Sequence, residues 1–204
     1  MRSATGDGRQ LGADLVSALS ATSGFVRGAV AGLALRADGG TEQLPGLAGH
    51  PLLAVGSPAL AVARAQIDAG RVYASFLGPL GGRRAAGGHA RLTAVVRPQQ
   101  APAALSGLVV VSPPGDLWGL TPRELEVLGL LIEGRTAGEI AGALLLAPRT
   151  GAAHLRHILG KLSTPTPTLA ALRAERDGLY VPPRISTPPP RPKPASQHDP
   201  NDNT

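Results

Sequence analysis

The sequence contains no cysteine, and this absence excludes several kinds of chemistry at once. Disulfide bonds, thiolate zinc sites and cysteine nucleophiles are all ruled out, and a reducing cytoplasm is the simplest compartment. Aromatic residues are only 2% of the 204, so a core has to be built mostly from Ala, Leu and Val. No apolar run approaches the roughly 18 residues of a membrane span, and the first ten residues lack the apolar segment of a secretion signal. We therefore expect a cytoplasmic protein with no membrane partner.

Lysine is nearly absent as well, since the chain has only Lys161 and Lys193. A phosphoacceptor receiver domain needs a lysine beside its aspartates, and a P-loop needs Gly-Lys-Ser/Thr, so residues 1–117 can hold neither. The G-x-S-x-G motif of serine hydrolases is missing. His50 and His89 lack the second histidine or the E-x-x-H spacing of a metal site. We expect no catalytic residues, no metal ligands, no cofactor and no enzymatic activity.

Basic residues outnumber acidic ones, giving a formal net charge of +6 and a sequence pI near 10.9. This balance favours polyanions as partners. The excess is spread along the chain, with ten Lys/Arg against six acids in residues 1–117 and seven against six in residues 118–183. The informative feature is local, because no Asp or Glu occurs between Glu139 and Glu175.

Proline and glycine divide the chain into parts. The run Ser112-Pro113-Pro114-Gly115-Asp116 predicts a linker at residues 113–117, between an N-terminal domain at 1–112 and a C-terminal domain at 118–183. Residues 184–204 are dense in proline and polar residues, which predicts a disordered tail.

The N-terminal domain shows short residue patterns typical of helices and others typical of strands. Spacing of apolar residues predicts helices at 11–19 and 58–69, and leaves 25–35 open between a buried strand and a poor helix. Segments rich in Leu and Val predict strands at 71–80, 91–96 and 105–111. We expect an α+β fold: a small N-terminal domain with helices first and antiparallel strands later, followed by an all-α domain.

Two helix-start signals stand close together in the C-terminal domain. Thr121-Pro122-Arg123-Glu124 combines an N-cap, a proline at the first helical position and the Glu of a capping box. Thr136-Ala137-Gly138-Glu139 repeats the box, two residues after a helix-ending Gly134. A third helix is expected to begin near Ala147-Pro148, which makes a helix-turn-helix unit.

The third helix has one apolar and one basic face. With Leu155 at the centre of a helical wheel, the apolar side also holds Gly151, Ile158, Leu159 and Leu162. The opposite face and its edges carry Arg149, Thr150, Ala153, His154, Arg156, His157, Gly160 and Lys161. Such a face suits a duplex groove, although a basic stripe alone is equally compatible with a solvated helix face. His154, at the edge, is more often a packing residue than a ligand.

The motifs LTPRELEVLGLLIEG, EIAGALL and PRT, followed by His154, Ile158 and Lys161-Leu162, resemble the LuxR/FixJ (GerE-type) DNA-binding domain of bacterial transcription regulators. The resemblance covers about residues 118–180. It implies an all-α domain of four helices, with the third helix in the major groove and a homodimer formed through the fourth helix near 167–177. It also implies base contacts at Ala152, Ala153 and Arg156, with Thr150 near the backbone.

The chain departs from this family pattern at a few positions. Ala147 replaces the usual Ser at the N-cap of the third helix, which removes about 1 kcal/mol of helix stabilisation. Gly151 replaces a buried Val, Gly138 stands where the family often has Lys, and Gly160 adds a second glycine to the third helix. These residues predict a less stable third helix or a lower affinity for DNA.

The N-terminal domain weakly resembles the reduced GAF- or PAS-like sensor domains of actinobacterial regulators. Such a domain binds a small ligand, dimerises or persists as a scaffold, and the Gly-rich insertions and few aromatics favour the last two.

The sequence thus predicts a sequence-specific transcription regulator that binds double-stranded DNA through Arg149, Thr150, Ala152, Ala153, His154, Arg156, His157 and Lys161. A homodimer, involving the N-terminal domain as well, and RNA polymerase are its further candidate partners. The alternative is a degenerate helix-turn-helix that acts as a protein-interaction module on another regulator.

Overall fold

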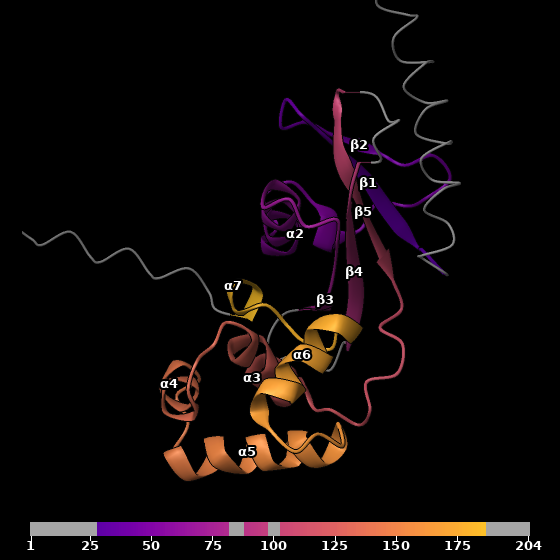
Figure 1. Cartoon of the computed structure of the whole chain (residues 1–204). Helices are drawn as coiled ribbons and strands as arrows, with labels where there is room; N and C mark the ends of the chain where they lie inside the picture. Colours follow the sequence, from indigo (N-terminus) through magenta and orange to yellow (C-terminus); the bar gives the residue numbers. More distant parts are fainter. Residues whose placement is uncertain (1–27, 82–87, 98–102, 187–204) are drawn as a thin grey trace, which may run out of the picture.

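The computed structural model describes residues 28–81, 88–97 and 103–186. A five-stranded antiparallel sheet in the order β2-β1-β5-β4-β3 forms the N-terminal part, and helices form the C-terminal part (Figure 1), which confirms the α+β prediction. The strands are β1 (Ala31–Arg36), β2 (Thr41–Gln43), β3 (Tyr73–Pro79), β4 (His89–Val96) and β5 (Leu105–Ser112).

The first strands of the sheet precede its main helix, whereas we expected helices first. Of the ambiguous segment 25–35, the described part forms β1, paired with β2 on one side and β5 on the other. Gly32 fits there because a Cβ at this position would lie 2.7 Å from Leu44 Cδ1. The structure therefore favours the buried strand over the poor helix. The helix predicted at 11–19 lies outside the described residues.

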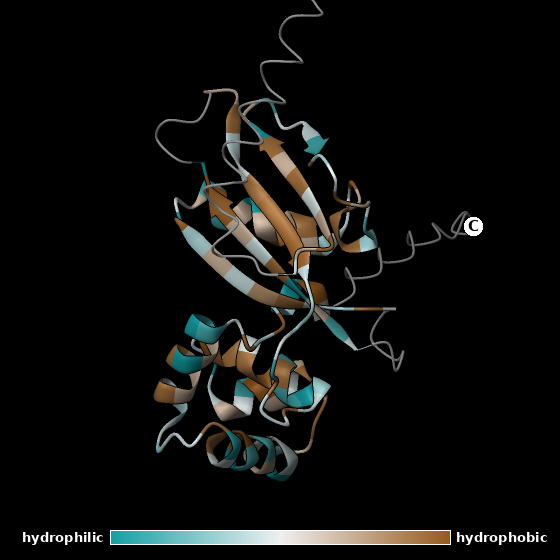
Figure 2. Cartoon of the chain, turned by 90° about the vertical axis from the view of Figure 1, so that its right-hand side faces the viewer, coloured by the Kyte–Doolittle hydropathy of each residue, from teal (hydrophilic) through white to brown (hydrophobic). Residues whose placement is uncertain are grey.

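One face of the sheet is covered by helix α2 (Pro58–Asp68), as the spacing of Leu60, Ala63 and Ile67 predicts. Ser57 caps this helix by accepting a hydrogen bond from the Leu60 N–H at 3.1 Å. Before it stands the short 3-10 helix η1 (Pro51–Leu53). Figure 2 shows the hydrophobic strands that this layer packs against.

The C-terminal part contains α3 (Pro122–Ile132), α4 (Ala137–Ala143), α5 (Pro148–Lys161) and α6 (Pro167–Asp177), which are the four helices expected. A fifth, short helix, α7 (Pro183–Ser186), stands where we predicted the tail to begin. It is ordered there because Ile185 packs against the main core. The tail predicted for 187–204 lies outside the described residues.

The two parts share a single hydrophobic cluster that runs from the sheet into the helices. The Leu77 N–H on the edge strand β3 donates to the Tyr180 carbonyl at 2.8 Å, and the rings of Phe76 and Tyr180 lie 6.4 Å apart. Helix α5 lies at the end of the molecule farthest from the sheet (Figure 1). Within the described ranges, no helix is long and apolar enough to cross a membrane.

Candidate nucleic-acid interface

Both predicted capping boxes are present and fix where α3 and α4 begin. The Thr121 N–H donates to Glu124 Oε2 at 2.7 Å, and the Glu124 N–H donates back to Thr121 Oγ1 at 3.3 Å. Thr136 and Glu139 form the same pair of hydrogen bonds at 2.8 and 3.4 Å. These reciprocal bonds satisfy backbone donors that a helix start leaves unpaired, so each helix has a defined first residue.

A tight turn joins α4 to α5 and sets the angle between them. Leu145 adopts a left-handed conformation with φ of 53° and is 94% exposed. The Leu146 N–H donates to the Ala141 carbonyl at 2.8 Å, and Arg123 of α3 donates to the Leu144 carbonyl. The turn is thus fastened to both preceding helices.

Gly151 explains one of the departures from the family pattern. It is buried, and a Cβ added to it would lie 3.1 Å from the Cβ of Ala141 on α4. The space that a larger residue would fill is taken up by a close approach of α4 to α5. The glycine weakens the helix but tightens the contact between the two helices.

The predicted DNA-binding residues of α5 share one side of the helix, and most are open to solvent. Ile158 and Gly151 are buried on the other side, with Leu155 and Leu159 partly buried. The exposed members are Arg149, Thr150, Ala152, Arg156 and His157, and the half-buried ones are Ala153, His154 and Lys161.

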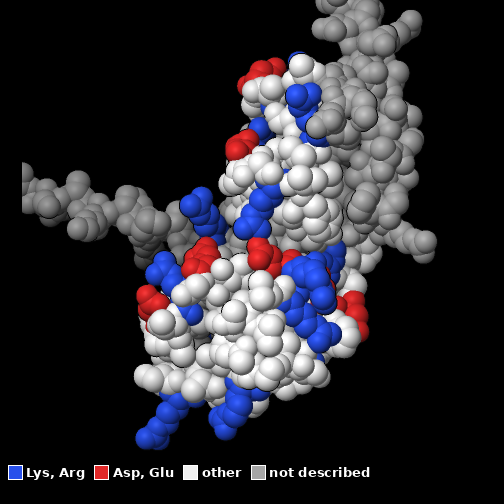
Figure 3. Space-filling view, viewed as in Figure 1, with Lys and Arg blue, Asp and Glu red and all other residues white. Residues whose placement is uncertain are grey.

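Charge on this surface is of one sign. Neither Arg149 nor Arg156 forms an ion pair within the described part of the chain, and α5 itself holds no acidic residue. Figure 3 shows basic side chains projecting from the end of the molecule where α5 lies, with no acidic ones beside them. Free guanidinium groups of this kind can neutralise phosphates or pair with base edges.

Lys161 differs from the other predicted cations because it has a partner inside the protein. Its Nζ lies 2.7 Å from Oε2 of Glu124, whose side chain is 2% exposed. Burial raises the pKa of the Glu124 carboxyl, but hydrogen bonds from Lys161 and Thr121 outweigh it and hold that pKa below its usual value. Lys161 therefore joins the end of α5 to the start of α3.

A second contact, which sequence reasoning missed, holds the C-terminal end of α5. Arg173 of α6 donates to the carbonyl of Leu162, the C-cap of α5, at 2.6 Å. The same guanidinium lies 4.6 Å from the ring centroid of Trp118. No local motif signals either contact, since the residues are brought together only by the fold.

The N-terminal end of α5 is less well held. Ala147 occupies the N-cap and makes no side-chain hydrogen bond to the helix, as its side chain dictates. Ala147→Ser is expected to raise the free energy of unfolding by about 1 kcal/mol, because the hydroxyl can accept from a free backbone N–H. Urea unfolding measures the change. Ala152→Ser, on the exposed helix interior, is the matched control and should not stabilise; equal effects would contradict the capping explanation.

Among the described residues, no group of three or more His, Asp or Glu side chains is placed to hold a metal ion.

Comparison with known proteins agrees with this geometry. Residues 119–174 match the family of bacterial regulatory proteins named the luxR family (GerE). The chain is 43% identical over 60 residues to the transcriptional regulatory protein LiaR of Bacillus subtilis, covering 29% of this chain and 28% of LiaR. It is 36% identical over 77 residues to LnrK of the same organism, covering 38% of this chain and 35% of LnrK.

These matches span about a third or less of each relative, so they describe the C-terminal domain rather than the whole chain. A solved structure of the Vibrio cholerae VqmA dimer covers 63% of this chain and 68% of VqmA, with 18% identity and a TM-score of 0.31. A TM-score that low does not establish a shared arrangement. The family match thus identifies residues 119–174 as a luxR-family helix-turn-helix domain.

Proposed function

We propose that this chain, whose residues 119–174 form a luxR-family helix-turn-helix domain, is a DNA-binding transcription regulator without catalytic activity. The observation that carries the proposal is the solvent-facing side of α5, where Arg149 and Arg156 lack acidic partners within the described residues. A helix about 10–12 Å across fits the major groove of B-DNA, so α5 can enter with this side forward.

The roles of individual residues follow from their chemistry. Arg156 is exposed on α5 and can form a bidentate pair with guanine. Ala152 and Ala153 are small, which allows close approach and contact with a thymine methyl group. Arg149 and Thr150, in the first turn of α5, suit phosphate oxygens, as that helix end carries positive dipole charge.

The remaining predicted residues, His154, His157 and Lys161, are less directly supported as DNA contacts. His157 is exposed beside Arg156, while His154 is half-buried at the edge of the face. Lys161 is already bound to Glu124, so its contribution to DNA binding would come through the orientation of α5 or a shared contact.

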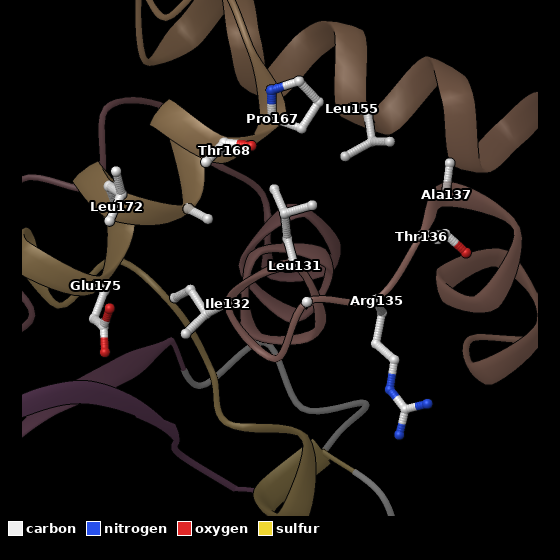
Figure 4. A pocket seen from close by; sticks show the side chains of 12 residues that line it. Leu131, Ile132, Arg135, Thr136, Ala137, Leu155, Pro167, Thr168, Leu172 and Glu175 are labelled. Carbon is white, nitrogen blue, oxygen red and sulfur yellow. The ribbon is translucent and has the colours of Figure 1, made fainter.

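We also propose that a homodimer forms along α6. Two leucines on this helix, Leu169 and Leu172, are 46% and 58% exposed. Beside them lies a groove of about 510 Å³ between α3, α5 and α6. Figure 4 shows Leu131 at its centre, with Leu155 and Pro167 above it. An apolar helix face next to an apolar groove is the kind of surface that a symmetric partner can cover.

The function is tested by selecting duplexes from a random library and measuring affinity by mobility shift. Arg156→Ala is expected to weaken binding to the selected duplex by about 5- to 150-fold, because a bidentate base contact is worth about 1–3 kcal/mol. Binding should also weaken steeply with salt, and less steeply for Arg149→Ala, which removes a phosphate contact.

Arg36→Ala is the matched control, since Arg36 lies on β1 and pairs with Asp38 on the surface. It should bind within twofold of the wild type. Full affinity in Arg156→Ala would remove Arg156 from base reading. If no duplex is retained even at low salt while another regulator co-purifies, the chain acts instead as a protein-interaction module.

For the N-terminal domain we propose a scaffold of the reduced GAF- or PAS-like kind. Its sheet carries a close-packed core around Phe76 and Leu92, and its edge strand binds the DNA-binding domain directly. Both features support a mechanical role.

A further inference from the structure

Arg91 of β4 joins the sheet to the DNA-binding domain through an array of hydrogen bonds. Its Nε and one terminal nitrogen donate to the Pro114 carbonyl in the linker at 3.1 and 2.7 Å. The other terminal nitrogen donates to the carbonyls of Asp177 and Gly178 at 2.8 and 3.3 Å, and to Ser75 Oγ at 3.1 Å. One half-buried guanidinium thus holds the linker, β3 and the C-terminal end of α6.

The partners of Arg91 suit its charge although none is a carboxylate. The carbonyls at the end of α6 carry the negative end of the helix dipole, and they have no partner within the helix. A guanidinium satisfies several of them at once, because its donors form a rigid planar fork. Removing it would leave these acceptors to water or unpaired.

Gly178 makes this close contact possible. It ends α6 in a left-handed conformation with φ of 62°. A Cβ added there would lie 2.3 Å from the Arg91 guanidinium and 2.6 Å from Ser75 Oγ. The glycine therefore serves both the helix end and the approach to the sheet.

Three more contacts hold the region around Gly178. The chain after Gly178 hydrogen-bonds to β3 through the Tyr180 carbonyl, and then to α3 through the Val181 N–H, which donates to the Leu125 carbonyl at 3.1 Å. Arg71, just before β3, lies 2.5 Å from Glu175 of α6. The end of α6 is thus fixed to the sheet at several points, while the solvent-facing side of α5 and the exposed leucines of α6 make none of these contacts.

We propose that Arg91 and Gly178 form a rigid junction that sets the orientation of the DNA-binding domain on the N-terminal sheet, and through α6 sets the spacing of the two recognition helices in a dimer. Arg91 is then a positioning residue, remote from DNA. The part of this inference that concerns dimers rests on the proposed function; the junction itself does not.

The junction is tested by distance measurement between spin labels in the full chain. The protein has no cysteine, so Val55→Cys and Leu145→Cys place one label on each part at positions 87% and 94% exposed. The wild-type background should give one narrow distance distribution. Arg91→Met should widen it at least twofold, and so should Gly178→Ala, which perturbs the junction by adding bulk instead of removing donors.

Arg36→Met, on the same sheet but away from the junction, is the control and should leave the distribution narrow. Arg71→Gln is a milder variant on a half-exposed side chain, which keeps the test open if Arg91→Met does not fold. Unchanged narrow distributions in the folded variants would overturn the junction.

A second readout uses duplexes in which the distance between two selected half-sites is varied by one to five base pairs. The wild type should prefer one spacing by tenfold or more, and Arg91→Met should reduce this preference to below threefold while still binding a single half-site. If the wild type binds no duplex, the proposed function is contradicted. The junction is still tested, because the spin-label distances do not depend on DNA binding. Preserved spacing preference in Arg91→Met would overturn the positioning role.

Discussion

Replacing Gly129 by alanine is expected to lower the free energy of unfolding by about 3 kcal/mol, the reverse of the usual effect of this exchange inside a helix. Gly129 lies in α3, and an added Cβ would stand 2.0 Å from the Val181 carbonyl oxygen and 3.0 Å from its carbon. Both are backbone atoms, so no side chain can turn away to make room.

The segment that passes over Gly129 is held by backbone hydrogen bonds at two neighbouring residues. Val181 donates to the Leu125 carbonyl, and Tyr180 accepts from Leu77 on the sheet. Moving the segment away from α3 would break the first bond or strain the second. In Gly129→Ala, the added methyl group would therefore push α3 away from residues 179–181, which link the DNA-binding domain to the sheet.

Gly142 of α4 provides the matched comparison, because an added Cβ there meets nothing within 4 Å. Gly142→Ala should stabilise the protein by up to about 1 kcal/mol through helix propensity alone. Urea unfolding of both variants, monitored by Trp118, gives the two changes with opposite signs. A Gly129→Ala protein as stable as the wild type would mean that residues 179–181 do not lie against α3.

Local signals in the sequence predicted most of the DNA-binding domain. Capping boxes at Thr121 and Thr136 and a proline at the start of α5 each act within a few residues, and their geometry depends little on the rest of the fold. The first three helices could therefore be placed from these local signals, whereas the fourth was placed by the family resemblance.

The contacts that join elements could not be predicted in this way. Glu124 was recognised as a capping residue, but its lysine partner is 37 residues away, and Arg91 meets Asp177 across 86 residues. Nothing near Gly129 in the sequence marks the segment that crosses it. Residues 25–35, whose described part forms β1, were left open between strand and helix because a short apolar run cannot be assigned by period alone.

Lys161→Met is expected to cost about 3 kcal/mol of unfolding free energy at neutral pH, because it leaves a buried carboxylate without its partner. Glu124 is 2% exposed, whereas the Lys161 side chain is 32% exposed. Glu124→Gln should therefore cost less, about 1 kcal/mol, since the stranded ammonium can be hydrated. Chemical unfolding of each variant measures the asymmetry.

The loss of unfolding free energy in Lys161→Met should depend on pH in a defined direction. The folded-state pKa of Glu124 lies below its reference value of 4.5, so the pair stabilises the protein above that pH and the gain is lost as the pH falls through the folded-state pKa. The difference between wild type and Lys161→Met should be full at pH 7 and shrink in acid. A difference that stays constant down to acid pH would contradict an ionised pair.

The double variant Lys161→Met/Glu124→Gln separates the two roles that Lys161 can have in DNA binding. Removing both charges relieves the unpaired carboxylate, so stability should recover beyond that of Lys161→Met alone. If Lys161 acts by orienting α5, affinity for the selected duplex recovers with stability. If Lys161 contacts a phosphate directly, affinity for the duplex stays low although stability recovers. The salt dependence of binding then remains reduced by about one counterion. Because Nζ already lies 2.7 Å from Glu124, we expect the first result.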